Sequence, residues 1–178
     1  HKSCVLASIP GSGLYSCTGT TDGGTRLFLV SSNKNASNLL AVDVSSRRWR
    51  RFATMPEPQG RSEHCIEWRS SSGLLYVAGG MGDSEPSFLR AFNEKTGLWE
   101  ELPRMPHGWC YAASAIIGNQ LFIAGGQDST TLQIYDIGSR TWRLGASIPD
   151  SRSPYADAFV VEGKLCLIHV NPNNSLLS

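Results

Sequence analysis

Residues 75–80 read Leu75-Tyr76-Val77-Ala78-Gly79-Gly80, a short apolar run that ends in a pair of glycines. Forty-six residues later the chain repeats the pattern as Leu121-Phe122-Ile123-Ala124-Gly125-Gly126. Aromatic and β-branched residues favour a buried strand, and glycine accepts the positive φ of a sharp turn. The sequence therefore predicts a strand that ends abruptly at each glycine pair, within a chain that is built of repeats.

Other residues recur in step with these two runs. An earlier copy begins at Leu27-Phe28-Leu29-Val30, with Ser31-Ser32 in place of the glycines. In all three copies an apolar residue stands seven positions before a tryptophan, and a proline stands seven positions after it. The three sets are Val42, Trp49 and Pro56; Phe92, Trp99 and Pro106; and Tyr135, Trp142 and Pro149. The regular spacing predicts large tryptophan side chains as apolar wedges between repeats.

Each copy has room for four short strands. A run of small residues precedes the glycine strand in the third copy, at Tyr111 to Ile117, and recurs at Tyr155 to Val161. Small side chains suit the most crowded position of a sheet. For the third copy we expect strands at about 110–117, 120–125, 131–137 and 140–144. Four antiparallel strands in a period of 43 to 50 residues describe a propeller blade, which must stack on its neighbours to bury its faces.

The repeats divide the whole chain. Residues 7–10 match residues 146–149 letter for letter, so residues 1–10 are expected to end a preceding blade. The expected blades follow in order, at 11–56, 57–106 and 107–149, and the first half of a further blade lies at 150–178. The predicted fold is all-β, a β-propeller with three complete four-stranded blades and partial blades at both ends, which indicates an incomplete ring or an excerpt of a longer polypeptide.

Composition limits the function classes. The 178 residues carry a formal net charge of +1, which gives no general attraction to nucleic acid or to anionic lipid. No apolar run is long enough to cross a membrane, and the N-terminus lacks the apolar core of a secretion signal. Five cysteines without CxxC spacing favour neither a disulfide framework nor a zinc site. These features predict a cytoplasmic or nuclear protein.

The glycine pair, the aromatic residue seven before the tryptophan and the proline seven after it resemble the kelch repeat. The resemblance is most specific for the second and third copies, whereas the first copy lacks the glycines. The chain contains no Trp-Asp and no Gly-His dipeptide, the marks of the WD40 repeat. The resemblance implies a kelch-type propeller. The segment Glu101 to Pro106 further resembles the propellers of F-box/kelch proteins, especially those of plants.

That resemblance implies a protein-interaction module without catalytic residues or cofactors, which serves as the substrate-recognition part of a cullin-based ubiquitin-ligase receptor. An F-box would contact the ligase adaptor, and no such helical segment is present in these residues; a BTB domain is the other possibility. Two alternatives stay open. One is an enzyme on the same scaffold, either a sugar mutarotase or a copper oxidase, for which Tyr111, Tyr155, Cys65 and Cys110 are the nearest candidates. The other is a propeller that binds the cytoskeleton.

The alternating direction of consecutive strands predicts the binding face. If consecutive strands alternate in direction, the loop after the second strand of a blade and the connection between blades lie on the same face of the disc. We expect a protein partner to contact eight residues of this face: Arg61, His64, Met81, Asp83, His107, Trp109, Asp128 and Arg152. Arg61 and Arg152 occupy corresponding positions and are expected to meet an acidic or polar segment. The four histidines follow no metal-ligand spacing, so no metal is predicted. Gly79, Gly80, Gly125, Gly126, Trp49, Trp99, Trp142, Phe92 and Tyr135 are expected to be structural.

Overall fold

The computed structural model describes residues 16–32, 37–56, 64–80, 87–108, 111–126, 129–148 and 156–169. These residues form fourteen strands and no helix. The first sheet holds β1 (Ser16–Thr21), β2 (Arg26–Ser32), β3 (Ser37–Asp43) and β4 (Arg48–Thr54). The second holds β5 (Cys65–Arg69), β6 (Leu74–Ala78), β7 (Leu89–Asn93) and β8 (Leu98–Leu102). The third holds β9 (Ala113–Ile117), β10 (Gln120–Ala124), β11 (Leu132–Asp136) and β12 (Thr141–Leu144), and the last is the hairpin of β13 (Ala156–Val161) and β14 (Lys164–His169).

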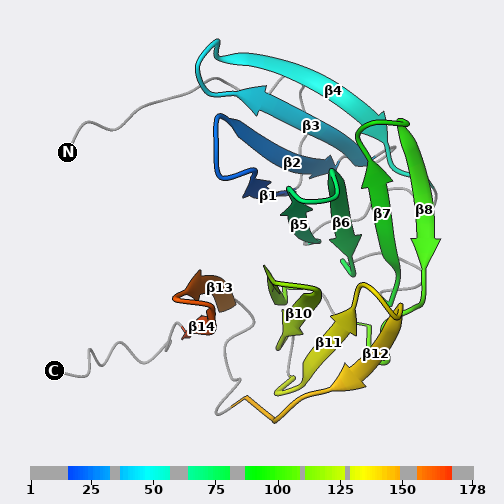
Figure 1. The fold of residues 1–178 in the computed structure, drawn as a ribbon, viewed down its shortest axis with the longest axis vertical. Coiled ribbons are helices and arrows are strands. Elements are labelled where there is room, and N and C mark those ends of the chain that lie inside the picture. The colour runs from blue at the N-terminus through cyan, green and yellow to red at the C-terminus, as the bar shows by residue number, and fades with distance from the viewer. Residues whose placement is uncertain are drawn as a thin grey trace, which may run out of the picture.

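Within each sheet every strand pairs antiparallel with the next strand of the chain. The sheets lie side by side around a common centre, with β1, β5 and β13 innermost and β4, β8 and β12 at the outer rim (Figure 1). The innermost strands contact one another in sequence, β1 with β5, β5 with β9 and β9 with β13. The described residues therefore form an all-β propeller with three complete blades and a two-stranded sheet after them, as the sequence predicted. The partial blade predicted for residues 1–10 lies outside the described residues.

The glycine pairs end the second strand of their blades. β6 stops at Ala78, and Gly79 and Gly80 follow with φ of 63° and 108°. β10 stops at Ala124, before a glycine pair with φ of 72° and 115°. In the first blade Ser31 and Ser32 continue the strand, since they still pair with residues of β3. Only glycine adopts such positive φ values without strain, so β2 runs to seven residues and β6 and β10 to five.

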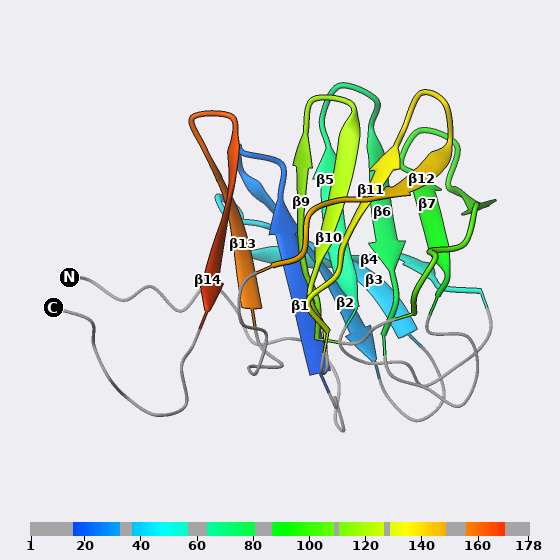
Figure 2. The same ribbon diagram turned by 90° about the horizontal axis from the view of Figure 1, so that it is seen from below.

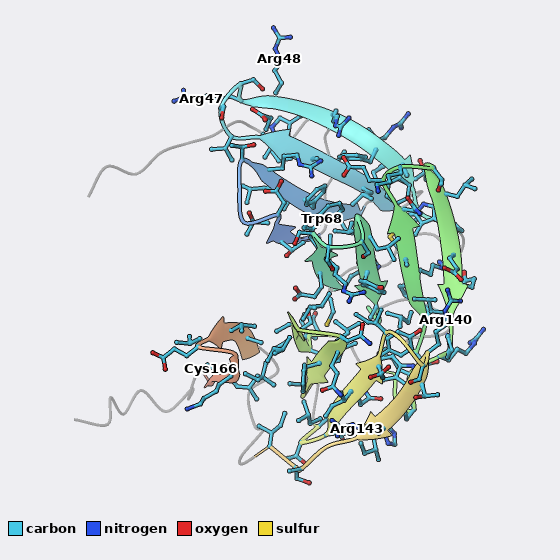
Figure 3. The ribbon with its side chains drawn as sticks, viewed as in Figure 1. Arg47, Arg48, Trp68, Arg140, Arg143 and Cys166 are labelled. Carbon is cyan, nitrogen blue, oxygen red and sulfur yellow. The ribbon has the colours of Figure 1, made fainter. Side chains whose placement is uncertain are left out.

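Tryptophans join neighbouring blades. The indole Nε1–H of Trp99 donates to the carbonyl oxygen of Thr54 in the first blade at 3.1 Å. In the same way Trp142 donates to the carbonyl oxygen of Pro103 in the second blade at 2.7 Å. Trp68 fills the space toward the first blade, where it stacks on Phe28 with ring centroids 4.6 Å apart (Figure 3). The interface between the first and second blades thus combines aromatic packing with a hydrogen bond, and a hydrogen bond of the same kind joins the second and third blades.

The innermost strand of the third blade begins three residues later than the sequence predicted. Tyr111 has φ of 59°, in the left-handed region, so extended pairing starts only at Ala113. The other three strands of this blade lie within one residue of their expected bounds. No helix in the described part of the chain is long and apolar enough to cross a bilayer.

Candidate functional site

Two parts of the propeller can meet a ligand: one face of the disc and the cavity at its centre. Figure 2 shows the tight turns between β5 and β6, β9 and β10, and β11 and β12 at one end of the sheets. The end of β6, which leads into a longer connection, lies at the other end (Figure 2). We call this second end the loop face. It is the face on which the alternating strand directions predict the binding residues to lie.

Most of the predicted binding residues lie outside the described residues: Arg61, Met81, Asp83, Trp109, Asp128 and Arg152. The structure places two, His64 and His107, on connections that enter the second and third blades. His64 is buried, with 3% of its surface exposed, and its ring meets Phe88 edge-on at 6.0 Å. The side chain of His107 is exposed. Of this pair, His107 is therefore the residue that a partner could contact directly, and a binding role for either stays a prediction.

A buried side chain holds each of these connections in place. Gln133 on β11 has no exposed surface; its Oε1 accepts from the backbone N–H of His107 at 2.9 Å, and its Nε2–H donates to the His107 carbonyl at 3.0 Å. The matching residue of β7 is Arg90, whose Nη1–H donates to the Pro56 carbonyl at 2.8 Å. Glu101 accepts a second bond from the same guanidinium. We call these contacts the connector clamps, because they anchor the backbone that carries the predicted binding loops.

Replacing Gln133 with leucine is expected to loosen the connection into the third blade. The change keeps the side-chain volume but removes both bonds to His107, and unmade bonds of this kind cost about 1 to 3 kcal/mol. We expect faster hydrogen exchange at the His107 amide and a free energy of unfolding lower by about 2 kcal/mol. Gln120→Leu, at the half-buried start of β10, is the matched control. Unchanged exchange at His107 in Gln133→Leu would contradict the clamp.

The second part is a cavity of about 870 Å³ along the propeller axis. Residues of the innermost strands β1, β5, β9 and β13 line it. Its size falls within the range of small-molecule pockets, roughly 300 to 1,000 Å³. We call it the axial cavity.

A carboxylate lies halfway along β5 in the wall of the axial cavity. Glu67 accepts a hydrogen bond on Oε1 from the hydroxyl of Ser114, which lies on β9 of the next blade, at 2.8 Å. Burial raises the pKa of Glu67 to about 7, and the bond from Ser114 offsets part of that effect. Among the residues that the structure describes, no lysine, arginine or histidine forms an ion pair with Glu67. The carboxyl group is therefore divided between its neutral and charged forms near neutral pH.

Two further polar side chains of β5 flank Glu67. The Cys65 thiol donates to the Ala112 carbonyl at 3.2 Å, and burial raises its pKa to about 12, so the thiol stays protonated. Arg69 turns toward the third blade, where its Nη2–H donates to Asn119 Oδ1 at 2.9 Å. Cys65 is thus neither a nucleophile nor an anionic ligand at neutral pH. In the described part of the chain, no three His, Cys, Asp or Glu side chains gather as a metal-ligand set.

Sequence reasoning missed Glu67, Ser114 and both clamp residues. One signal was available for Glu67: the strand registers match it to Thr20 of the first blade and Ala115 of the third. A charged residue at a repeat position that is otherwise small marks a departure from the scaffold pattern. No such signal identified the clamps, because glutamine and arginine at matching positions look unrelated in a sequence.

Comparisons with known proteins agree with this architecture. The Kelch motif matches residues 108–149. The chain is 32% identical over 126 residues to human Kelch-like protein 33, covering 70% of this chain and 21% of that protein. It is 25% identical over 119 residues to an F-box/kelch-repeat protein of Arabidopsis thaliana, covering 64% and 27%. For Kelch repeat and BTB domain-containing protein 2 of cowpox virus the identity is 25% over 134 residues, covering 70% and 23%.

A solved structure supports the fold independently. The structure of YjhT superposes with a TM-score of 0.73 at 16% identity, covering 91% of this chain and 60% of the other. The chain spans only about a fifth to a quarter of the length of the three sequence relatives named above. The glycine pairs, the inter-blade tryptophans and these matches lead to one conclusion: the chain is a kelch-repeat protein, and its repeats resemble those of F-box/kelch proteins.

Proposed function

We propose that this propeller recognises a protein partner through its loop face, as the substrate-binding part of a cullin-based ubiquitin-ligase receptor. The main structural support for a role in protein binding is the pair of connector clamps. Arg90 and Gln133 hold the connections into the second and third blades at fixed points, Pro56 and His107. Loops on anchored ends lose less conformational freedom on binding, which favours affinity.

The ligase role rests on the relatives. Two of them carry an F-box or a BTB domain in their names, together with kelch repeats. In this proposal a segment outside these residues contacts the ligase adaptor, and the propeller holds the target. The test is affinity capture of the full-length protein from cells, followed by identification of bound proteins. Recovery of ligase adaptor components supports the role, and their consistent absence while other partners are captured would contradict it.

Arg61 and Arg152 are proposed to contact an acidic or polar segment of the partner. Arginines at the centre of an interface often contribute 2 kcal/mol or more to binding, about a 30-fold change in affinity. For Arg61→Ala combined with Arg152→Ala we expect at least a tenfold weaker affinity for a captured partner, measured by calorimetry. The matched control is Arg47→Ala with Arg48→Ala, two exposed arginines at the outer rim of the first blade (Figure 3). Equal affinities of the two double variants would place the site elsewhere.

The alternatives draw less support from the described residues. A copper site of the oxidase kind would need Cys65 as a ligand or as part of a cross-link. The Cys65 thiol is protonated and donates a hydrogen bond to the carbonyl oxygen of Ala112. Cys110 and Tyr155, the other residues considered for it, lie outside the described residues. Copper analysis of the purified protein, a sugar-turnover assay and an actin pelleting assay test the enzyme and cytoskeletal alternatives directly.

A further inference from the structure

We propose that the axial cavity binds one organic cation, an ammonium or guanidinium group, which pairs with the carboxylate of Glu67. One of the predicted loop-face residues, His64, also lines this cavity, but the proposed site is centred on Glu67. It does not depend on the ligase role.

The geometry of Glu67 is the first reason. Ser114 donates to only one of the two carboxylate oxygens, Oε1, and no ion pair from the described residues neutralises the charge. The Glu67 side chain is half-buried, and a charge that is partly removed from water is costly unless it is paired and hydrogen-bonded. The group therefore gains most from a ligand that brings a positive charge and hydrogen-bond donors into the cavity.

The surroundings of Glu67 are the second reason. Three titratable groups face it from β5 and β6: the thiol of Cys65, the phenol of Tyr76, which lies opposite Glu67 in the strand register, and the guanidinium of Arg69. A fourth, the buried ring of His64 just before β5, lines the same cavity and packs edge-on against Phe88. The thiol and the phenol have raised pKa values because of burial and stay neutral at neutral pH. Arg69 lies two residues along the strand and is bound to Asn119. From β9 the facing side chain is Ser114, which does not titrate.

The depth of the site selects the kind of cation. Glu67 is the middle residue of the five-residue strand β5, so it lies about 7 Å from either end at roughly 3.3 Å per residue. A lysine or arginine side chain, or an alkyl cation of similar length, can span that distance while its stem lies along the wall. A Ca²⁺ ion needs six to eight oxygen ligands. The Glu67 and Ser114 pair offers far fewer, and the described residues hold no metal-ligand group.

The pKa of Glu67 supplies a signature for binding. Burial raises this pKa to about 7, and an adjacent cation would lower it again. Because only part of the Glu67 population is protonated at pH 7, binding at that pH should release a fraction of a proton per site, and the affinity should rise between pH 6 and 8. Calorimetry in two buffers of different ionisation enthalpy measures the released proton.

The experiment titrates the protein with acetyl-Gly-Arg-Gly-amide and with the neutral citrulline analogue of the same peptide at pH 8. Amide chemical shifts of β5 and β9 report binding at the site. We expect the arginine peptide to bind at least tenfold more tightly than the citrulline peptide. Glu67→Gln should remove this preference, and Glu100→Gln, on the exposed face of β8, should keep it. Thermal melts check that both variants fold.

The cation could be a free small molecule or the arginine side chain of a protein partner. A third probe, butylguanidinium, distinguishes these two sources. Binding as tight as that of the arginine peptide indicates a free small molecule, and binding at least tenfold weaker indicates the side chain of a protein partner. Both results support the site. Three results would overturn it: no shift on β5 or β9 at about 10 mM arginine peptide, equal binding of the arginine and citrulline peptides, or an unchanged preference in Glu67→Gln.

Discussion

Replacing Trp142 with alanine is expected to lower the free energy of unfolding by about 3 kcal/mol. Truncation of a core aromatic residue typically costs about 3 to 5 kcal/mol, and the half-buried indole of Trp142 belongs at the lower end of that range. The ring packs on Tyr135 with centroids 5.0 Å apart and donates to Pro103 of the preceding blade at 2.7 Å. The variant therefore loses contacts within its blade and between two blades. Chemical denaturation followed by circular dichroism measures the loss.

Two further variants separate the parts of this effect. Trp142→Phe keeps an aromatic ring but removes the hydrogen bond and a small part of the packed surface, so we expect a loss of about 1 kcal/mol. Leu144→Ala, two residues along the same strand, alters a side chain in a residue that is 54% exposed and should cost less than 1 kcal/mol. If Trp142→Ala is as stable as Leu144→Ala, the tryptophan does not hold the blades together. The indole of Trp99 donates to the carbonyl oxygen of Thr54, so Trp99→Ala should lower the free energy of unfolding by a similar amount.

The fold could be predicted because each local sequence signal, such as the glycine pair or the tryptophan spacing, recurs in more than one copy of the repeat. Gly79 and Gly125 end their strands through positive φ, and Ser31, which has no such freedom, continues its strand. The tryptophan spacing likewise predicted where each outer strand lies, since Trp99 and Trp142 both fall in the fourth strand of a blade. These features depend on short stretches of chain, so the sequence contains them directly.

The axial site could not be predicted, because it depends on how neighbouring blades are aligned. Glu67 and Ser114 are 47 residues apart and meet only when β5 and β9 stand side by side at one height. The connector clamps each lie within one blade and the connection into it, but they likewise join segments 34 and 26 residues apart in the chain. Gln133 and Arg90 differ in size and charge, yet each reaches the backbone of the connection into its own blade. Contacts between repeats follow from packing, which no single repeat encodes.

The candidate residues of the loop face remain predictions for a similar reason. Strand direction brings the connections of all blades to one end of the disc (Figure 2). It does not determine the course of the loops themselves, because their sequences differ from one copy of the repeat to the next. His64 illustrates the difference: its place on a connection predicted exposure, whereas its ring is buried against Phe88.

Replacing Glu67 with glutamine is expected to stabilise the protein at pH 8 and to change its stability little at pH 4.5. The folded protein raises the pKa of Glu67 from the ordinary 4.5 to about 7, so it favours the neutral carboxyl group. Relative to a permanently neutral side chain, the wild-type protein loses stability as the pH rises from about 4.5 through 7, because the buried group must ionise. The difference between the two pKa values corresponds to at most about 3 kcal/mol, and we expect about 2. Glutamine keeps an acceptor for Ser114 and removes the titration.

The measurement compares thermal and chemical unfolding of Glu67→Gln, Glu100→Gln and the wild-type protein between pH 4.5 and 8. Only Glu67→Gln should show a stability advantage that grows with pH, because Glu100 is exposed and pairs with Arg140 at the rim. An arginine-containing ligand that pairs with Glu67 should shrink this advantage at pH 8, since it stabilises the charged form in the wild-type protein alone. A pH-independent difference between Glu67→Gln and the wild-type protein would show that the carboxyl group titrates normally, and proton release on cation binding would then not be expected at pH 7.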